Sequence, residues 1–218
     1  VMRTQADGIG GARRPQIFDP GVLEVWRRYA KLRTQLYPYL VAADRAYARS
    51  GMPIMRQLAL AFPRDPRATG RDGQYLFGPD LMVAPVFEPG ATSRRVYLPR
   101  GDWVDLWDAV GFRPGNGSFR LRDRARIVRG PRAVDAEAPL REIPVFARAG
   151  TLLPLLPPNV ETLADYGDSD HVSLGDRRGH LHVIALPRGT SEARFGKGGT
   201  LSSTEGDDNW RLRVDSPR

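Results

Sequence analysis

The segment Gln74-Tyr75-Leu76-Phe77-Gly78-Pro79-Asp80-Leu81-Met82-Val83-Ala84-Pro85-Val86 decides how the whole sequence is interpreted. Gly78-Pro79-Asp80 is typical of a turn, and Leu81 to Val86 is a short apolar run of the kind that forms a buried strand. One long amphipathic helical pattern comes before this segment, and short strand patterns separated by Gly and Pro come after it. The segment therefore predicts the point where an α/β region gives way to an all-β region.

A helix is predicted to begin at Asp19-Pro20, because Asp is a good N-cap and Pro is tolerated at the first helical position. Pro38 should kink or divide this helix, and Ser50-Gly51 should end it. Apolar residues recur in steps of three and four, which predicts one buried face with most of the arginines opposite it. That face consists of Val22, Trp26, Tyr29, Leu32, Leu36, Leu40, Ala43 and Tyr47.

The apolar run from Pro53 to Phe62 follows the helix closely, and we expect it to be a buried strand of a parallel α/β unit. Beyond Arg94, strand patterns separated by turn residues recur at the spacing typical of an antiparallel sandwich. The expected strands are 96–99, 103–107, 118–129, 143–146, 151–156, 171–174, 180–186 and 210–214.

Composition excludes several classes of site. The 218 residues include no Cys, so disulfides, thiol nucleophiles and Cys-ligated metals are excluded. No apolar run of about 18 residues is present, so no transmembrane helix is expected. The net charge is +8, but the arginines are interleaved with acids along the whole chain, which favours a general preference for Arg over a nucleic-acid surface.

Few residues indicate chemistry on spacing alone. His180 and His182 would share one strand face, but no third metal ligand accompanies them, so neither a metal nor a cofactor is expected. No phosphate loop, dinucleotide fingerprint or nucleophile elbow is present. A pair of carboxylates for glycoside hydrolysis cannot be assembled from spacing either, so no catalytic residue is assigned.

Several pieces of the sequence resemble, in order, the C-terminal third of glycoside hydrolase family 31, the α-glucosidase and α-xylosidase group. The matching pieces are Leu32-Arg33-Thr34-Gln35-Leu36-Tyr37-Pro38-Tyr39-Leu40, Gly51-Met52-Pro53-Ile54-Met55-Arg56, Gln74 to Val86, 96–107 and 143–151. Each piece is moderately specific, but the ordered set is strong. The resemblance covers about residues 1–157.

The resemblance implies an α/β plus all-β chain. Residues 1–80 would be the C-terminal segment of a (β/α)8 barrel, with Ile54 to Phe62 as its last strand. Residues 81–157 would be a proximal antiparallel β-sandwich domain, and 158–218 the incomplete start of a distal β domain. The start Val1-Met2-Arg3 and the small C-terminal unit both predict a piece of a longer protein.

The family's function is implied in the same way. A retaining α-glycosidase would cleave terminal α-glucosidic or α-xylosidic bonds, and both of its catalytic aspartates would precede Val1. Arg3 and Gln5 lie where the family places an Arg and a His that line the sugar pocket, so we expect them to bind substrate hydroxyls. Gln5 departs from the usual His, and Arg3 has the alternative interpretation of a loop ion-pair residue.

The partner expected from this interpretation is an oligosaccharide or α-glycoside, with no nucleic acid and no membrane; a homo-oligomer remains open. The 218 residues alone are expected to be inactive. The alternative is a non-catalytic carbohydrate-binding or scaffold protein, in which Trp103 or Trp107 would form an exposed sugar platform. The resemblance instead favours packing roles for these two tryptophans.

Overall fold

The computed structural model describes residues 18–167, 170–186, 188–195, 199–205 and 210–215. The chain divides into two units, the first of which contains the described parts of Val1–Tyr37, Phe112–Arg120 and Leu155–His182. The second unit contains the described parts of Pro38–Gly111, Leu121–Pro154 and Val183–Arg218. The predicted substrate-binding residues Arg3 and Gln5 lie outside the described residues.

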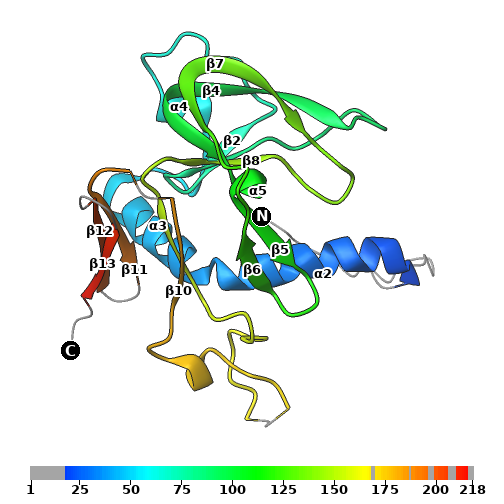
Figure 1. Ribbon diagram of the computed structural model, residues 1–218, viewed down its shortest axis with the longest axis vertical. Helices are drawn as coiled ribbons and strands as arrows, with labels where there is room; N and C mark the ends of the chain where they lie inside the picture. Colours follow the sequence, from blue (N-terminus) through cyan, green and yellow to red (C-terminus); the bar gives the residue numbers. More distant parts are fainter. Residues whose placement is uncertain (1–17, 168–169, 187, 196–198, 206–209, 216–218) are drawn as a thin grey trace. The chain divides into compact units, whose positions relative to one another are not determined.

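Two helices replace the single long helical pattern, α2 (Pro20–Gln35) and α3 (Tyr37–Ser50) (Figure 1). The Asp19 carboxylate accepts a hydrogen bond of 3.0 Å from the Val22 amide, which confirms the predicted N-cap. The predicted division is also confirmed: Leu36 separates the helices, and Pro38 lies in the first turn of α3, where a proline is tolerated. Helix α3 ends as predicted at Ser50, and Gly51 follows with φ of 71°.

The buried face of these helices differs from the prediction. Val22 and Tyr47 are exposed, whereas Arg28 is buried. In the first unit, the Gln35 side chain donates a hydrogen bond of 2.7 Å to the Gly117 carbonyl. Helix α2 is therefore fixed partly through long polar side chains, which a pattern of apolar residues does not reveal.

A six-stranded sheet dominates the second unit, with the strand order β1-β2-β3-β8-β4-β7 and antiparallel pairing throughout. Figure 1 shows β4 and β7 as its two long strands, lying side by side. The six strands are β1 (Met55–Gln57), β2 (Tyr75–Phe77), β3 (Leu81–Val83), β4 (Ser93–Asp105), β7 (Ile127–Glu137) and β8 (Val145–Arg148).

The quoted segment forms the β2–β3 hairpin, which lies between β1 and β8 in this sheet, and its turn lies at Gly78-Pro79-Asp80 as predicted. The strand predicted from Pro53 to Phe62 is wrong in extent and in pairing. Only β1 is extended there, it pairs antiparallel with β2, and α4 (Leu58–Ala61) follows it at once. A (β/α)8 barrel segment is thus not shown by the described residues.

The remaining elements form small sheets or single helical turns. Strand β5 (Val110–Arg113) pairs with β6 (Ser118–Leu121), β9 (Leu152–Leu155) with β10 (His182–Ala185), and β11 (Ser191–Phe195) with β12 (Gly199–Glu205), which also pairs with β13 (Trp210–Asp215). The helical turns are α5 (Leu106–Ala109) and η2 (Gly175–Arg177). The strand predicted at 171–174 is wrong, because only an isolated bridge from Ser173 to Thr162 is present. None of the described helices is long and apolar enough to cross a membrane.

The core of the second unit lies on the six-stranded sheet. Its largest member, Trp103, is completely buried, and its indole N–H donates a hydrogen bond of 2.9 Å to the Pro99 carbonyl. Trp107 lies in the next helical turn rather than ending a strand, since the Asp105 carboxylate caps α5 through the Trp107 amide. The core also contains Leu58, Leu76, Met82, Val96, Leu98 and Phe146.

Candidate functional site

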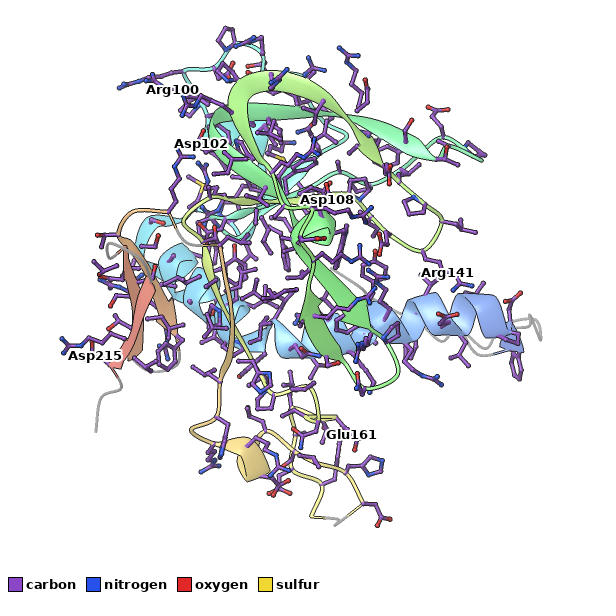
Figure 2. The ribbon with its side chains drawn as sticks, viewed as in Figure 1. Arg100, Asp102, Asp108, Arg141, Glu161 and Asp215 are labelled. Atoms are coloured by element: carbon purple, nitrogen blue, oxygen red, sulfur yellow. The ribbon has the colours of Figure 1, made fainter. Side chains whose placement is uncertain are left out.

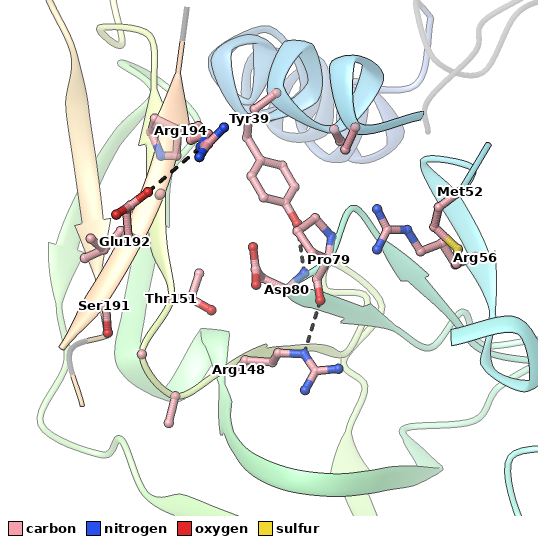
Figure 3. A pocket seen from close by; sticks show the side chains of 18 of the residues that line it. Tyr39, Met52, Arg56, Pro79, Asp80, Arg148, Thr151, Ser191, Glu192 and Arg194 are labelled. Atoms are coloured by element: carbon pink, nitrogen blue, oxygen red, sulfur yellow. Dashed lines mark hydrogen bonds and ion pairs between the residues drawn. The ribbon is translucent and has the colours of Figure 1, made fainter. Parts of the chain in front are cut away.

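A hollow of about 740 Å³ lies within the second unit, where five segments meet. Helix α3, β1, the β2–β3 turn, the segment from β8 to β9, and β11 each contribute to its wall. Figure 3 shows its polar side chains arranged around one open space. This space is hereafter called the arginine-lined hollow, after the five arginines in its wall, Arg49, Arg56, Arg148, Arg188 and Arg194.

Tyr39 of α3 holds the β2–β3 turn against one side of the hollow. Its hydroxyl donates a hydrogen bond of 2.8 Å to the Phe77 carbonyl. It also accepts one of 3.1 Å from the Asp80 amide, drawn in Figure 3. Burial, and to a smaller degree the charge of Asp80, raises the pKa of Tyr39 well above its ordinary value. Gly78 has φ of 67°, and a Cβ at this position would collide with the Tyr39 ring. Glycine is therefore required where the turn meets the helix.

Arg148 and Asp80 are half-buried charges in the wall of the hollow. The Arg148 guanidinium lies 4.8 Å from the Trp103 ring centroid and 5.2 Å from that of Phe62, and its Nε donates a hydrogen bond of 3.1 Å to the Pro79 carbonyl. Burial lowers the pKa of Arg148, while the charge of Asp80 opposes that shift. Burial conversely raises the pKa of Asp80, and the nearby Arg148 and Arg56 guanidiniums lower it. Two stacked rings thus fix the direction of the Arg148 guanidinium.

The rim of the hollow contains pairs that neutralise each other. Arg188 lies 2.6 Å from the carboxylate of Asp102, which also binds Arg129 at 3.1 Å and is labelled in Figure 2. Arg194 lies 3.9 Å from Glu192, and both side chains are largely exposed. Each rim arginine therefore has a carboxylate partner, so the rim contributes little net charge to the hollow. Solvent also weakens the field of such exposed pairs.

A second hollow, of about 620 Å³, lies elsewhere in the same unit and is lined mainly by charged residues. Burial raises the pKa of Asp105 to about 6, although the hydrogen bond from the Trp107 amide opposes the shift; the negative charges of Asp108 and Glu142 raise it further. Arg124 lies 3.9 Å from Asp108 on its wall. In the described parts of the chain, no group of three or more His, Cys, Asp or Glu side chains could hold a metal ion.

The structure brings together residues that the sequence analysis did not join. Arg148 and Asp80 were each part of a quoted segment, but both were assigned to packing or to a turn. An acidic residue directly after a Gly-Pro turn was the available signal. Trp103 and Trp107 are 0% and 6% exposed, which confirms their packing role and leaves no platform for a sugar ring. The described residues contain neither Arg3 nor Gln5, so their roles stay predictions.

The chain is similar in sequence to one protein family and to several of its known members. Residues 51–153 match the model of the glycosyl hydrolase family 31 C-terminal domain. The chain is 32% identical to an isomaltosyltransferase of Sporosarcina globispora over 155 residues, which are 69% of this chain and 13% of that protein. It is 32% identical to an alpha-xylosidase of Saccharolobus solfataricus over 157 residues, which are 72% of this chain and 19% of that protein.

A lysosomal alpha-glucosidase of Mus musculus is 34% identical over 166 residues, covering 74% of this chain and 17% of that protein. The chain thus spans no more than 19% of the length of these three relatives. Among solved structures, it is similar to the GH31 dextranase of Flavobacterium johnsoniae complexed with isomaltotriose, with a TM-score of 0.69 and 25% identity. That similarity covers 93% of this chain and 24% of the dextranase chain.

Proposed function

Because the chain belongs to glycosyl hydrolase family 31, we propose that it is part of a retaining α-glycosidase that hydrolyses terminal α-glucosidic or α-xylosidic bonds. The observation that carries the proposal is the similarity to the dextranase structure, which extends over 93% of this chain but only 24% of that one. The curated relatives in turn include an α-xylosidase and an α-glucosidase. We therefore place the catalytic aspartates of the whole protein upstream of Val1.

In this proposal the chain is a supporting and substrate-facing part of the enzyme. Residues 1–80 form the C-terminal segment of the catalytic barrel, 81–157 the proximal β-sandwich domain, and 158–218 the start of a distal β domain. Arg3 and Gln5 donate hydrogen bonds to sugar hydroxyls. The many hydrogen bonds that fix the β2–β3 turn support a scaffold role, since a site on a rigid sheet keeps its geometry during turnover.

The proposed reaction is a double displacement. One aspartate attacks the anomeric carbon and forms a covalent glycosyl-enzyme intermediate, while the second, about 5 Å away, protonates the leaving oxygen. Water then releases the sugar with the same anomeric configuration, and the second aspartate acts as base in that step. The isomaltosyltransferase among the relatives fits the same chemistry, with a sugar hydroxyl replacing water as the acceptor.

The stereochemistry of the first product tests this mechanism. The chain extended upstream in its own reading frame is mixed with an aryl α-glucoside, and the anomeric proton of the released sugar is followed by NMR before mutarotation equilibrates it. The α-anomer is expected first. Appearance of the β-anomer first would show an inverting mechanism and overturn the proposal.

The alternative of a non-catalytic sugar-binding protein is not favoured. It requires an exposed aromatic platform, but the side chains of both Trp103 and Trp107 are buried and their indole N–H groups donate to the Pro99 and Ile143 carbonyls. Titration of the chain with malto- and xylo-oligosaccharides should therefore leave the fluorescence of these two tryptophans unchanged.

A further inference from the structure

The arginine-lined hollow has more positive charge than its own acids neutralise. Asp102 and Glu192 pair with the rim arginines, Arg188 and Arg194. The other three, Arg49, Arg56 and Arg148, have no carboxylate within ion-pair distance among the described residues, and Asp80 is the remaining acid in the wall. Three guanidiniums therefore face one carboxylate, which leaves an excess of two positive charges around the open space.

The guanidiniums also have unused donors. Arg148 and Arg56 each use Nε to donate to a backbone carbonyl, that of Pro79 at 3.1 Å and that of Pro53 at 2.8 Å. Within the described parts of the chain, the Nη groups of both arginines make no hydrogen bond. The two rings and the Pro79 carbonyl hold the Arg148 guanidinium, and the Pro53 carbonyl orients that of Arg56, so their outer N–H groups are available to an acceptor with two oxygens.

A second, independent feature points to a ligand. Thr151 lines the hollow and is 4% exposed, yet its hydroxyl has no hydrogen-bond partner in the described structure. Buried hydroxyl groups are normally hydrogen-bonded, because leaving one unpaired is costly. Figure 3 shows Thr151 and Asp80 on the wall of the same space. A ligand with hydroxyl groups would therefore supply a hydrogen-bond partner to the Thr151 hydroxyl and a donor to the Asp80 carboxylate.

The size of the hollow suits a small ligand. Its volume of about 740 Å³ lies within the usual range for small-molecule sites, about 300–1,000 Å³. Helix α3 contributes Ala42, Ala43 and Ala46 to the wall, and their short side chains keep the space open. The wall therefore combines small apolar groups from α3 with a larger set of polar and charged side chains from the other segments.

We propose that the arginine-lined hollow binds a small oxyanion that also has hydroxyl groups, the chemistry shared by acidic sugars and sugar phosphates. The anionic group binds to the Nη groups of Arg56 and Arg148. The hydroxyl groups bind to the Asp80 carboxylate and the Thr151 hydroxyl. The inference does not depend on the proposed glycosidase activity, since it rests on the wall of the hollow alone.

Isothermal titration of the full chain with four ligands tests the proposal: glucuronate, glucose 6-phosphate, inorganic phosphate and glucose. Glucuronate or glucose 6-phosphate should bind at least tenfold more tightly than glucose, and the tighter of the two identifies the anionic group. At least one of them should also bind more tightly than inorganic phosphate, because phosphate lacks the carbon-bound hydroxyls. Equal binding of glucose, binding of inorganic phosphate alone, or no binding at millimolar concentration would overturn it.

Two variants and one control locate the binding. Arg56→Gln should weaken binding about tenfold or more, and Thr151→Val about fivefold, according to the usual strengths of charged and neutral hydrogen bonds. Arg64→Gln, which removes the same charge from an exposed position outside the wall, should leave the affinity unchanged. Thr151→Val should not lower the urea midpoint, because it removes an unpaired buried hydroxyl. Wild-type affinity in both wall variants, or an equal loss in the control, would contradict the assignment.

Discussion

Alanine at Gly78 should destabilise the chain far more than alanine at Gly51, although the two glycines have nearly the same backbone conformation. Their φ angles are 67° and 71°, so each substitution costs about 1–2 kcal/mol of backbone strain. Among the residues that the structure describes, nothing lies within 4 Å of a Cβ at Gly51, whereas a Cβ at Gly78 would overlap the buried ring of Tyr39.

This overlap determines how much more stability Gly78→Ala should lose than Gly51→Ala. The Tyr39 ring would have to move, and its hydrogen bonds to the Phe77 carbonyl and the Asp80 amide would break. Each of the two broken bonds costs about 1–2 kcal/mol, so Gly78→Ala should cost roughly 2–4 kcal/mol more than Gly51→Ala. With a urea m-value of about 2–3 kcal/mol/M, this difference should lower the midpoint by about 1 M.

Urea unfolding of both variants measures the difference, and a second background checks its cause. In a Tyr39→Ala chain the ring is absent, so Gly78→Ala should there cost only about 1–2 kcal/mol, as at Gly51. Equal midpoints for Gly78→Ala and Gly51→Ala would refute the reasoning. So would an undiminished cost of Gly78→Ala in the Tyr39→Ala background.

Burial raises the pKa of Asp105 from an ordinary 3.8 to about 6 in the folded chain. Its contribution to stability is therefore present below about pH 4 and is lost as pH rises through 6. Asp105→Asn keeps the cap and should remove about 1–2 kcal/mol of this pH dependence, measured by urea unfolding at pH 4–7. Gln74→Leu should cost about 2–4 kcal/mol by urea unfolding, because the buried side-chain amide makes hydrogen bonds to both the N–H and the C=O of Tyr97. The control Gln57→Leu, at an exposed position, should change stability by under about 0.5 kcal/mol. Asp19→Ala should lower helicity measured by circular dichroism and cost about 1 kcal/mol, while Asp19→Asn should restore both, because Asn is an equally good cap.

Local signals in the sequence were sufficient wherever one or two residues determine the backbone. The cap at Asp19, the helix end at Gly51 and the turn at Gly78 follow from side-chain hydrogen bonding and from backbone freedom, and the structure confirms all three. Antiparallel pairing in the main sheet also followed from the spacing of the strand patterns, but β5, β11 and β12 lay outside the expected strands.

Strand limits and pairing could not be predicted in the same way, because neighbours distant in sequence determine them. Pro99 and Gly101 indicated the end of a strand, but β4 continues past them to Asp105 through a register shift. Leu58 and Phe62 are four apart and were taken for a strand, yet α4 lies between them and the Phe62 amide donates to the Leu58 carbonyl. A short apolar run is compatible with both structures.

The candidate site could not be predicted from sequence spacing for the same reason. Asp80 and Arg148 are separated by 68 positions, and only the pairing of β3 with β8 brings them to one wall. The missing partner of the Thr151 hydroxyl is likewise a property of packing. By contrast, the family followed from the sequence, because its motifs occur in order along the chain.

We propose that this chain belongs to an α-glycosidase whose catalytic aspartates lie upstream of it. The most direct test compares hydrolysis of an aryl α-glucoside and an aryl α-xyloside by the chain as given and by the chain extended upstream in its reading frame. Release of the aryl group by the extended form alone is predicted, and the better substrate then identifies the specificity. Turnover by the 218 residues alone would place a catalytic carboxylate pair within them and contradict the account.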